Sequence, residues 1–132
     1  MRLKKKKKIL VVDDDPNITE VIEEFLSFEG YDVSVENFAS KAVDKANEVL
    51  PDLILLDIMM PEIDGYEVCS ALKINPKTSG VPILFLSGRD SKEDDGRSFG
   101  VGGDLYIKKP FSNDRLSQMV KMVLLTTSTK AR

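Results

Sequence analysis

Three apolar runs of this chain each end in charged residues, and this repeated arrangement most constrains how the chain can fold. The runs cover residues 9–12, 53–56 and 105–108, and they lead into Asp13-Asp14-Asp15, Asp57 and Lys109-Pro110 respectively. Short apolar runs bounded by turn-forming residues are typical of buried strands. Ligands of an open parallel sheet bind outside the carboxyl ends of its strands. The sequence therefore predicts that several carboxylates and one ammonium group meet at a single edge of a sheet.

The composition is that of one globular domain. The chain has 132 residues, and a single cysteine cannot form an internal disulfide, which fits a reducing compartment. The longest apolar run is far shorter than the roughly 20 residues that span a bilayer. The apolar stretch after the N-terminal lysines is also shorter than the roughly 7 residues that a signal peptide needs. We therefore expect a cytoplasmic protein without membrane insertion.

The lysines at positions 4–8 give the chain an uneven charge distribution. Removing these five lysines from a net charge of −3 leaves −8 for the rest of the chain. An acidic body without a basic stripe does not favour direct binding of nucleic acid. For the lysine run, a solvated and frayed terminus is the preferred interpretation, and contact with an anionic surface or partner is the alternative.

The pattern of apolar residues predicts alternating strands and helices. Strands are expected at residues 8–12, 31–36, 52–57, 81–86 and 105–108. Helices are expected at residues 16–29, 39–50, 66–73 and 91–98, and a last helix contains residues 116–124 before a polar tail at 126–132. An apolar face at 18, 21, 22, 25 and 26 should bury the first helix, and Pro51 should close the second. The alternation predicts an α/β fold with a parallel sheet and helices on both faces.

The aspartates at the predicted sheet edge point to metal or phosphoryl chemistry. Asp57 follows four apolar residues, so it is either a metal ligand only or a nucleophile that forms an acyl phosphate. Asp13 and Asp14 either cap the next helix or turn toward a common ion, whereas Asp15 is the expected N-cap. Converging carboxylates raise each other's pKa unless a cation lies between them. Because the chain has no histidine, a hard ion such as Mg²⁺ is the expected cation.

A lysine and a serine complete this predicted site. Lys109 precedes Pro110, which restricts the local backbone, and its ammonium can pair with a carboxylate or with a phosphoryl oxygen. Ser87 provides a hydroxyl at the end of the fourth predicted strand. Together with Asp57 as an in-line nucleophile, these residues predict a phosphoryl-transfer site in which Lys109 and Ser87 bind the remaining oxygens.

The chain resembles the receiver domain of two-component response regulators, of the chemotaxis-regulator kind, over residues 7–125. The resemblance is carried by residues 9–16 (ILVVDDDP), 55–65 (LLDIMMPEIDG) and 108–111 (KKPF). It implies a flavodoxin-like, doubly wound, five-stranded parallel sheet in the order 2-1-3-4-5, with helices on both faces. It also divides the chain into a basic N-terminal extension (1–6), the receiver domain (7–125) and a polar C-terminal tail (126–132).

The same resemblance implies roles for the acidic residues. Asp57 accepts a phosphoryl group from the phosphohistidine of a partner. Asp13 and Asp14, together with Asp57, hold Mg²⁺, with Mn²⁺ as the alternative ion. The backbone carbonyl of Met59 completes the shell of the ion.

Further roles concern the switch between two states. By resemblance, Ser87 is the hydroxyl that moves to the phosphoryl group, and Lys109 is the lysine of the family's third motif. Tyr106 falls on the aromatic position that turns inward on activation, and an ordinary half-buried strand aromatic is the alternative interpretation. The helix at 91–98 is glycine-containing and poor in apolar residues, so we expect it to be marginally ordered before activation.

The expected partners follow from the resemblance. The phosphoryl donor is a sensor histidine kinase or a phosphotransfer protein, and the target is a downstream protein or an output domain outside this chain. A phosphorylation-dependent dimer through the fourth and fifth helices is compatible with the family. The chain is expected to be a signalling switch and not an enzyme, with self-phosphorylation and self-dephosphorylation as its only chemistry.

Three other interpretations fit the sequence less well than a receiver domain. A degenerate receiver would act as a constitutive interaction domain, but Asp13, Asp14, Asp57, Ser87 and Lys109 are all present. A magnesium-dependent phosphatase of the haloacid dehalogenase kind usually has a second aspartate two residues after its nucleophile, and here that position is Met59. A flavodoxin-like cofactor binder would need a phosphate-binding loop rich in glycine and hydroxyl groups after the first strand, which this chain lacks.

Overall fold

The computed structural model describes residues 5–88 and 105–130 and contains a single parallel sheet. The strand order is β2-β1-β3-β4-β5. The strands are β1 (Lys8–Val12), β2 (Asp32–Glu36), β3 (Leu53–Asp57), β4 (Ile83–Ser87) and β5 (Leu105–Lys108). The predicted doubly wound α/β fold and its strand order are confirmed.

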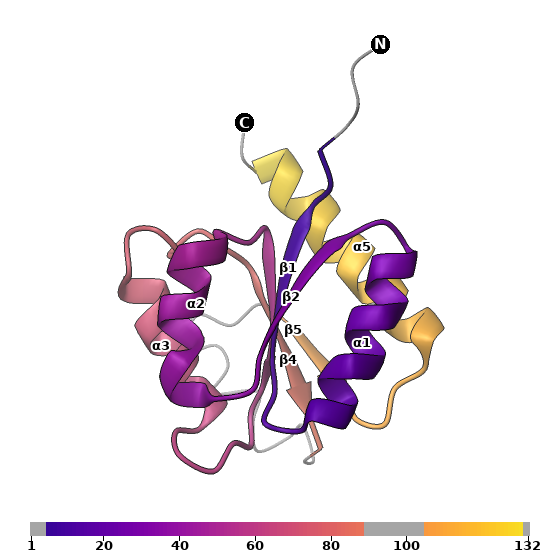
Figure 1. The fold of residues 1–132 in the computed structure, drawn as a ribbon. Coiled ribbons are helices and arrows are strands. Elements are labelled where there is room, and N and C mark those ends of the chain that lie inside the picture. The colour runs from indigo at the N-terminus through magenta and orange to yellow at the C-terminus, as the bar shows by residue number, and fades with distance from the viewer. Residues whose placement is uncertain (1–4, 89–104, 131–132) are drawn as a thin grey trace.

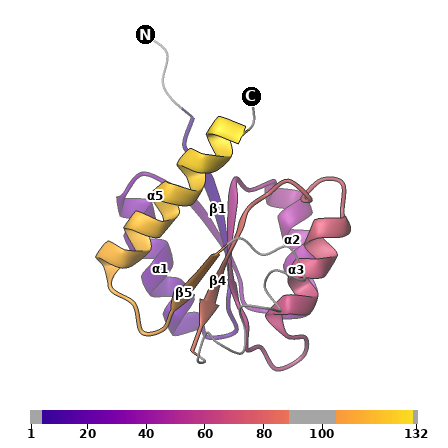
Figure 2. The ribbon, with the colours of Figure 1, turned by 180° about the vertical axis from the view of Figure 1, so that it is seen from behind.

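The helices form a layer on each face of the sheet. They are α1 (Pro16–Phe28), α2 (Ala42–Val49), α3 (Gly65–Ile74) and α5 (Asn113–Lys130), and a 3₁₀ turn, η1 (Ala39–Lys41), precedes α2. Figures 1 and 2 show α1 and α5 on one face of the sheet and α2 and α3 on the other. The helix predicted at 91–98, together with the expected change in its order, lies outside the described residues.

The two faces of the sheet contribute to two separate hydrophobic cores. Successive side chains of a strand point to opposite faces, and every residue of β3 and β4 is buried. One core contains Leu10, Ile54, Phe85 and the apolar side chains of α2 and α3. The other contains Ile9, Leu55 and the apolar side chains of α1 and α5. Each fully buried large aliphatic side chain contributes about 1.5–3 kcal/mol to folding, so the central strands are firmly held between the layers.

The start of α1 follows its predicted signals. Asp15 is the N-cap, its carboxylate accepts from the backbone N–H of Asn17, and Pro16 opens the helix. After the helix ends, Gly30 adopts a φ of +102°, a conformation that side-chain-bearing residues rarely adopt. One predicted core position was wrong, because Val21 is 59% exposed. It borders a hollow between α1 and α5 and does not face the sheet.

Several predicted boundaries also need correction. The helix predicted at 39–50 begins as the η1 turn, and it ends at Leu50, which has a φ of +53°, one residue before Pro51. The last helix continues to Lys130, although it was expected to end before Thr126. β1 and β5 have their predicted bounds, and the other described elements differ from prediction by one or two residues at one or both ends, as is usual for element boundaries.

No helix within residues 5–88 and 105–130 combines the length and the apolar character that a bilayer crossing requires.

Candidate functional site

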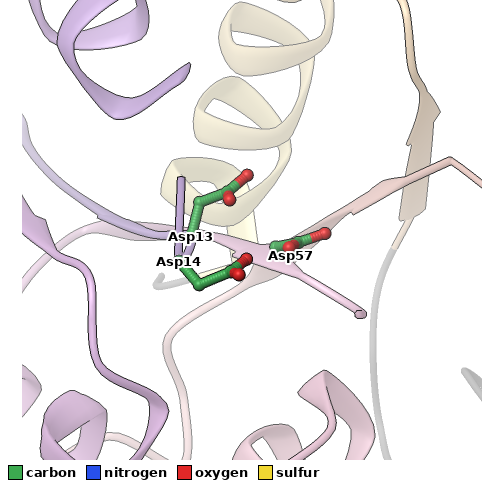
Figure 3. A group of neighbouring side chains, drawn as sticks. All are labelled: Asp13, Asp14 and Asp57. Carbon is green, nitrogen blue, oxygen red and sulfur yellow. The ribbon is translucent and has the colours of Figure 1, made fainter. Parts of the chain in front are cut away.

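The carboxyl ends of β1 and β3 bring two buried carboxylates together. The two strands are paired in parallel, so Asp13, which follows β1, and Asp57, which ends β3, reach the same edge of the sheet. Asp13 is 0% exposed and Asp57 is 4% exposed, whereas Asp14 is exposed. Each of the three carboxylates offers one oxygen within 4.8 Å of the others. Figure 3 shows the three groups directed to the same side.

The carboxylate of Asp13 is held at both of its oxygens. Oδ1 accepts from the backbone N–H of Asp15 at 3.0 Å, and Oδ2 accepts from Nζ of Lys109 at 3.0 Å. The backbone of Asp13 is also held, because its N–H donates to the carbonyl of Glu36 and its carbonyl accepts from Nδ2 of Asn37. The orientation of this carboxylate is therefore set by the protein itself, before any ligand arrives. One oxygen of Asp13 thus contacts the backbone just before α1, and the other contacts Lys109 at the site.

Lys109 connects the two buried aspartates. Its Nζ donates to Oδ2 of Asp13 at 3.0 Å and to Oδ1 of Asp57 at 3.2 Å. The backbone N–H of Lys109 donates to the carbonyl of Ser87 at 2.6 Å, which places the residue directly beyond the end of β4. Burial lowers the pKa of the Lys109 ammonium, but the hydrogen bonds and charges of Asp13 and Asp57 outweigh this effect and raise the pKa overall. The lysine is therefore positively charged at neutral pH.

The environment of Asp57 disfavours its charged form. Burial, and then the charge of Asp13, raise the pKa of Asp57 from 3.8 to about 7, and Lys109 and the backbone N–H of Met59 offset only part of this rise. One ammonium group is thus not enough to balance the two buried carboxylates. The site favours a further positive charge beside Asp57.

This pKa predicts how stability depends on pH in the presence of a chelator. Because the pKa of Asp57 is about 7 in the folded state and 3.8 ordinarily, between these values the folded chain binds a proton that the unfolded chain has released. The wild type should therefore lose stability as pH rises toward 7. At pH 8, we expect Asp57→Asn to raise the free energy of unfolding by roughly 1–2 kcal/mol, after allowance for solvent screening.

Urea denaturation at a series of pH values measures this difference. The difference in the free energy of unfolding between Asp57→Asn and the wild type should decrease below pH 7. It should disappear near pH 4, where the side chain at position 57 is neutral in both folded proteins. A gap that stays constant across the series would show that the charge of Asp57 does not cause it.

The loop after Asp57 packs directly against the backbone of that residue. The N–H of Gly65 donates to the carbonyl of Ile58 at 2.7 Å. A Cβ at position 65 would lie 2.7 Å from Cα of Ile58 and closer still to the carbonyl oxygen of Asp57. Only glycine fits there. The sequence analysis treated Gly65 as a loop residue and part of a motif, and it did not predict this contact.

Ser87 and Met59 both lie near Asp57. Ser87 ends β4, is 2% exposed, and lies one residue beyond Leu86, the register partner of Asp57. Met59 follows two residues after Asp57, and its side chain is 53% exposed. The hydroxyl of Ser87 thus belongs to the same edge of the sheet as the carboxylates.

Tyr106 is paired with a second tyrosine that the sequence analysis missed. The hydroxyls of Tyr66 and Tyr106 are hydrogen-bonded at 2.5 Å. The rings of both tyrosines pack against Phe85, at centroid distances of 5.1 and 5.6 Å. Tyr66 is almost fully buried and directly follows Gly65. The pair therefore connects β5 to the first turn of α3, which packs on the backbone of Asp57. An aromatic residue directly after Asp64-Gly65 was the available signal.

The donor set fits a small, hard divalent ion. An octahedral Mg²⁺ binds oxygen at 2.0–2.1 Å, so its ligand oxygens lie about 3–4 Å apart. The oxygens of Asp13, Asp14 and Asp57 are gathered within 4.8 Å. All three donors are carboxylate oxygens, and the exposure of Asp14 leaves the site open to the water molecules that Mg²⁺ tends to keep.

An apolar hollow of about 600 Å³ adjoins the acidic site. It lies between α1 and α5 and begins at Lys109, Pro110 and Phe111. Ile18 and Val21 of α1 form the opposite wall. A partner that reached Asp57 from this side would find an apolar surface beside the carboxylates.

Comparison with known proteins agrees with this geometry. The sequence model of the response regulator receiver domain matches residues 9–121. The chain is 40% identical over 118 residues to the alkaline phosphatase synthesis transcriptional regulatory protein PhoP of Bacillus subtilis, covering 89% of this chain and 48% of that protein. It is 38% identical over 116 residues to the DNA-binding response regulator MtrA of Mycolicibacterium smegmatis, covering 88% of this chain and 50% of that protein. The chain thus spans about half the length of the curated relatives that it matches.

Solved structures of similar size share the whole fold. A CheY-like response regulator receiver domain protein from Methanospirillum hungatei superposes with a TM-score of 0.87 at 31% identity, covering 96% of this chain and 99% of that one. The chemotaxis protein CheY4 of Vibrio cholerae gives a TM-score of 0.87 at 28% identity, covering 90% of this chain and 99% of that one.

Proposed function

Because this chain belongs to the response regulator receiver domain family, the signalling switches of two-component systems, we propose that its Asp57 accepts a phosphoryl group from the phosphohistidine of a partner. The observation that carries the proposal is the position of Lys109, whose ammonium lies between Asp57 and Asp13 at the ends of two buried strands. A nucleophile, a fixed positive charge and a nearby hydroxyl at one edge are the parts that phosphoryl transfer requires.

Each residue has a definite part in the transfer. A carboxylate oxygen of Asp57 forms a bond to phosphorus as the bond between phosphorus and the imidazole nitrogen breaks, and the imidazole takes up a proton. The ammonium of Lys109 lies 3.2 Å from Asp57, close enough to pair with a phosphoryl oxygen as the group arrives. The hydroxyl of Ser87 donates to another phosphoryl oxygen. Because Ser87 ends β4, this hydrogen bond couples phosphorylation to the position of that strand.

Asp13, Asp14 and Asp57 would hold Mg²⁺, with the backbone carbonyl of Met59 as a further ligand and Mn²⁺ as the alternative ion. When bound, the ion supplies positive charge that neutralises the phosphoryl oxygens. The elevated pKa of Asp57, about 7, supports this assignment, because a further cation would favour the ionised form that attacks.

Intact mass spectrometry after incubation with a small acyl-phosphate donor tests the proposal. The wild type should gain one phosphoryl group in the presence of Mg²⁺ and none in the presence of a chelator. Asp57→Ala should gain none under either condition, because the variant lacks the nucleophile. A phosphoryl group that still appears on the Asp57→Ala chain would place the acceptor elsewhere. Self-phosphorylation and self-dephosphorylation are the only enzymatic chemistry proposed.

We place the docking site of the phosphohistidine partner, a sensor kinase or a phosphotransfer protein, on the hollow between α1 and α5. The hollow begins at Lys109, which contacts Asp57, so a partner seated there would be adjacent to the acceptor. Val21 offers an exposed apolar side chain on its wall. Apolar anchors beside a reactive group are the usual centre of such interfaces.

A charge introduced into this hollow should slow phosphoryl transfer from a protein donor but not from a small acyl phosphate. With a phosphohistidine protein that phosphorylates the wild type, we expect Val21→Glu to slow transfer by about tenfold or more, because a carboxylate would be buried in an apolar interface. Labelling by the small acyl phosphate should be unchanged. Met122→Glu is the matched control, since Met122 is 49% exposed on α5 but does not line the hollow. Equal slowing with both donors would contradict the docking site.

The target of the switch is proposed to be a downstream protein or an output domain, without direct nucleic acid binding by this domain. The relatives PhoP, a transcriptional regulatory protein, and MtrA, a DNA-binding response regulator, are about twice the length of this chain, which supports an output domain in their case. Ser87 and Tyr106 are the proposed switch residues, and a dimer through the predicted fourth helix and α5 is the proposed phosphorylated assembly. The cytoplasm is the proposed compartment, in keeping with the single, buried cysteine.

A further inference from the structure

The edge of the sheet opposite the acidic site is marked by consecutive lysines. Residues 5–8 are all lysine, all are exposed, and they lead into β1. Figures 1 and 2 show that β1 begins and α5 ends at this edge. Asp57 is the last residue of β3 and therefore lies at the other end of the strands. The backbone of this segment is held in place, since the N–H of Asp32 donates to the carbonyl of Lys7 and the N–H of Lys8 donates to Asp52.

Exposed apolar side chains lie at the same end of the sheet as these lysines. Phe28, the last residue of α1, is 90% exposed, and Leu125 on α5 is 71% exposed. Leu50, which ends α2, is 54% exposed and lines one shallow hollow together with the lysines at 5–8. Leu125 lines a second hollow together with Lys7 and Lys121. We call the lysines at 5–8, Phe28, Leu50 and Leu125 the lysine face.

The charges of the lysine face are directed to solvent. Within residues 5–88 and 105–130, the ammonium groups at positions 5–8 form no ion pair within 4 Å. Asp32 and Asp52 lie at the base of the segment and offset part of its charge. The carboxylate of Asp52 accepts from the backbone N–H of Lys8, and Asp32 contacts Lys7 through its own backbone N–H. The lysines could have a purely structural role. α1 and α2 have no basic residue in their last turns, so nearby lysines would offset the partial negative charge at the C-terminal ends of these helices. That role does not explain why exposed apolar side chains surround them.

We propose that the lysine face docks this domain on an anionic phospholipid surface. Lysine clusters adsorb to anionic lipid headgroups, and exposed apolar side chains among them enter the boundary between headgroups and acyl chains. Phe28, Leu50 and Leu125 are suited to that boundary, whereas a nucleic acid backbone would offer them little. The acidic site, at the far edge, would be repelled by such a surface and would remain turned toward its partners.

Vesicle sedimentation with the 132-residue chain tests the proposal. The wild type should bind vesicles of phosphatidylcholine and phosphatidylglycerol at low ionic strength, and it should not bind vesicles of phosphatidylcholine alone. Binding should weaken as salt is added, because the attraction is electrostatic. Failure of the wild type to bind the anionic vesicles at low salt would overturn the proposal.

Variants that remove equal charge at two places show whether the lysine face is responsible for vesicle binding. The double variant Lys6→Gln/Lys7→Gln should bind roughly 30-fold more weakly, which corresponds to about 1 kcal/mol for each lysine near an anionic leaflet. Lys41→Gln/Lys45→Gln removes the same charge near the start of α2 and should bind as the wild type does. Equal weakening in both variants would overturn the proposal, because it would reflect net charge alone.

Substitutions of the exposed apolar side chains distinguish binding to lipid from binding to other polyanions. Phe28→Ser should weaken vesicle binding several-fold, and Phe38→Ser, which removes a 56% exposed phenylalanine far from the lysines, should not. Binding to a short DNA duplex at least as tight as binding to anionic vesicles, and unchanged in Phe28→Ser, would overturn the lipid assignment in favour of nucleic acid. All variants should accept a phosphoryl group as the wild type does, so the result is independent of the proposed phosphorylation.

Discussion

Lys109→Ala should lower the rate of phosphoryl incorporation from a small acyl-phosphate donor by about 10²–10³-fold, the usual effect of removing one group that stabilises developing charge. In the wild type, the ammonium lies 3.0 Å from Asp13 and 3.2 Å from Asp57, so it is already in place when the phosphoryl group arrives. The rate is measured by intact mass over time at saturating Mg²⁺.

The neighbouring lysine provides the control for this prediction. Lys108→Ala removes an exposed ammonium at the end of β5 and should incorporate phosphate at the wild-type rate. A second measurement distinguishes lost chemistry from a damaged site, because Lys109→Ala should bind Mg²⁺ at least as tightly as the wild type by calorimetry. Removing a positive charge beside the carboxylates favours a cation. A Lys109→Ala chain that is labelled at the wild-type rate would contradict the role proposed for Lys109.

Gly65→Ala should lower the free energy of unfolding by about 3 kcal/mol, near the upper end of the usual cost of overpacking. The added Cβ would lie 2.7 Å from Cα of Ile58 and still closer to the carbonyl oxygen of Asp57. These are backbone atoms of the segment that ends β3, so the conflict cannot be relieved by rotation of a side chain. The displaced segment carries the phosphoryl acceptor, and we expect incorporation of phosphate to fall as well.

Gly80→Ala is the matched control for Gly65→Ala. Nothing lies within 4 Å of a Cβ built at Gly80, so this substitution should change stability by less than about 1 kcal/mol. Urea denaturation of both variants in the presence of Mg²⁺ measures the difference. If Gly65→Ala proves as stable as Gly80→Ala, the close approach seen at Asp57 is not a constraint on this loop.

The parts of the fold that the sequence predicted well are those with a local cause. The bounds of β1 and β5 agree with prediction because an apolar run flanked by charge admits few alternatives. Asp15 and Pro16 marked the start of α1 correctly, since an N-cap followed by proline satisfies the first turn without tertiary contacts. The strand order, by contrast, came from family resemblance and not from the pattern of residues.

The predicted burial of Val21 and the predicted end of the last helix were wrong, although both followed from the local sequence pattern. Val21 continues the apolar stripe of α1, yet it faces the hollow beside α5, because the sheet covers only part of that stripe. The extension of α5 through Thr126 to Lys130 runs against the low helix propensity of threonine and serine. The exposure of Val21 depends on how α1 packs on its neighbours, and a short window of sequence does not contain that information.

For the site, the sequence predicted which side chains meet but not how they are supported. Asp13, Asp57 and Lys109 meet as expected, because the carboxyl ends of parallel strands share an edge. The pairing of Tyr66 with Tyr106 and the approach of Gly65 to Asp57 were not predicted. These supports depend on three-dimensional fit between segments that are distant in the sequence.

The edge strand β2 has a consequence for how this protein behaves at high concentration. A strand at the border of a sheet is a template for edge-to-edge association and for fibril growth. β2 begins with Asp32 and ends with Glu36, so two copies aligned along this border would set carboxylate against carboxylate. This repulsion opposes edge-to-edge association through β2, so the acidic ends of the strand help to keep copies of the domain apart in concentrated solution.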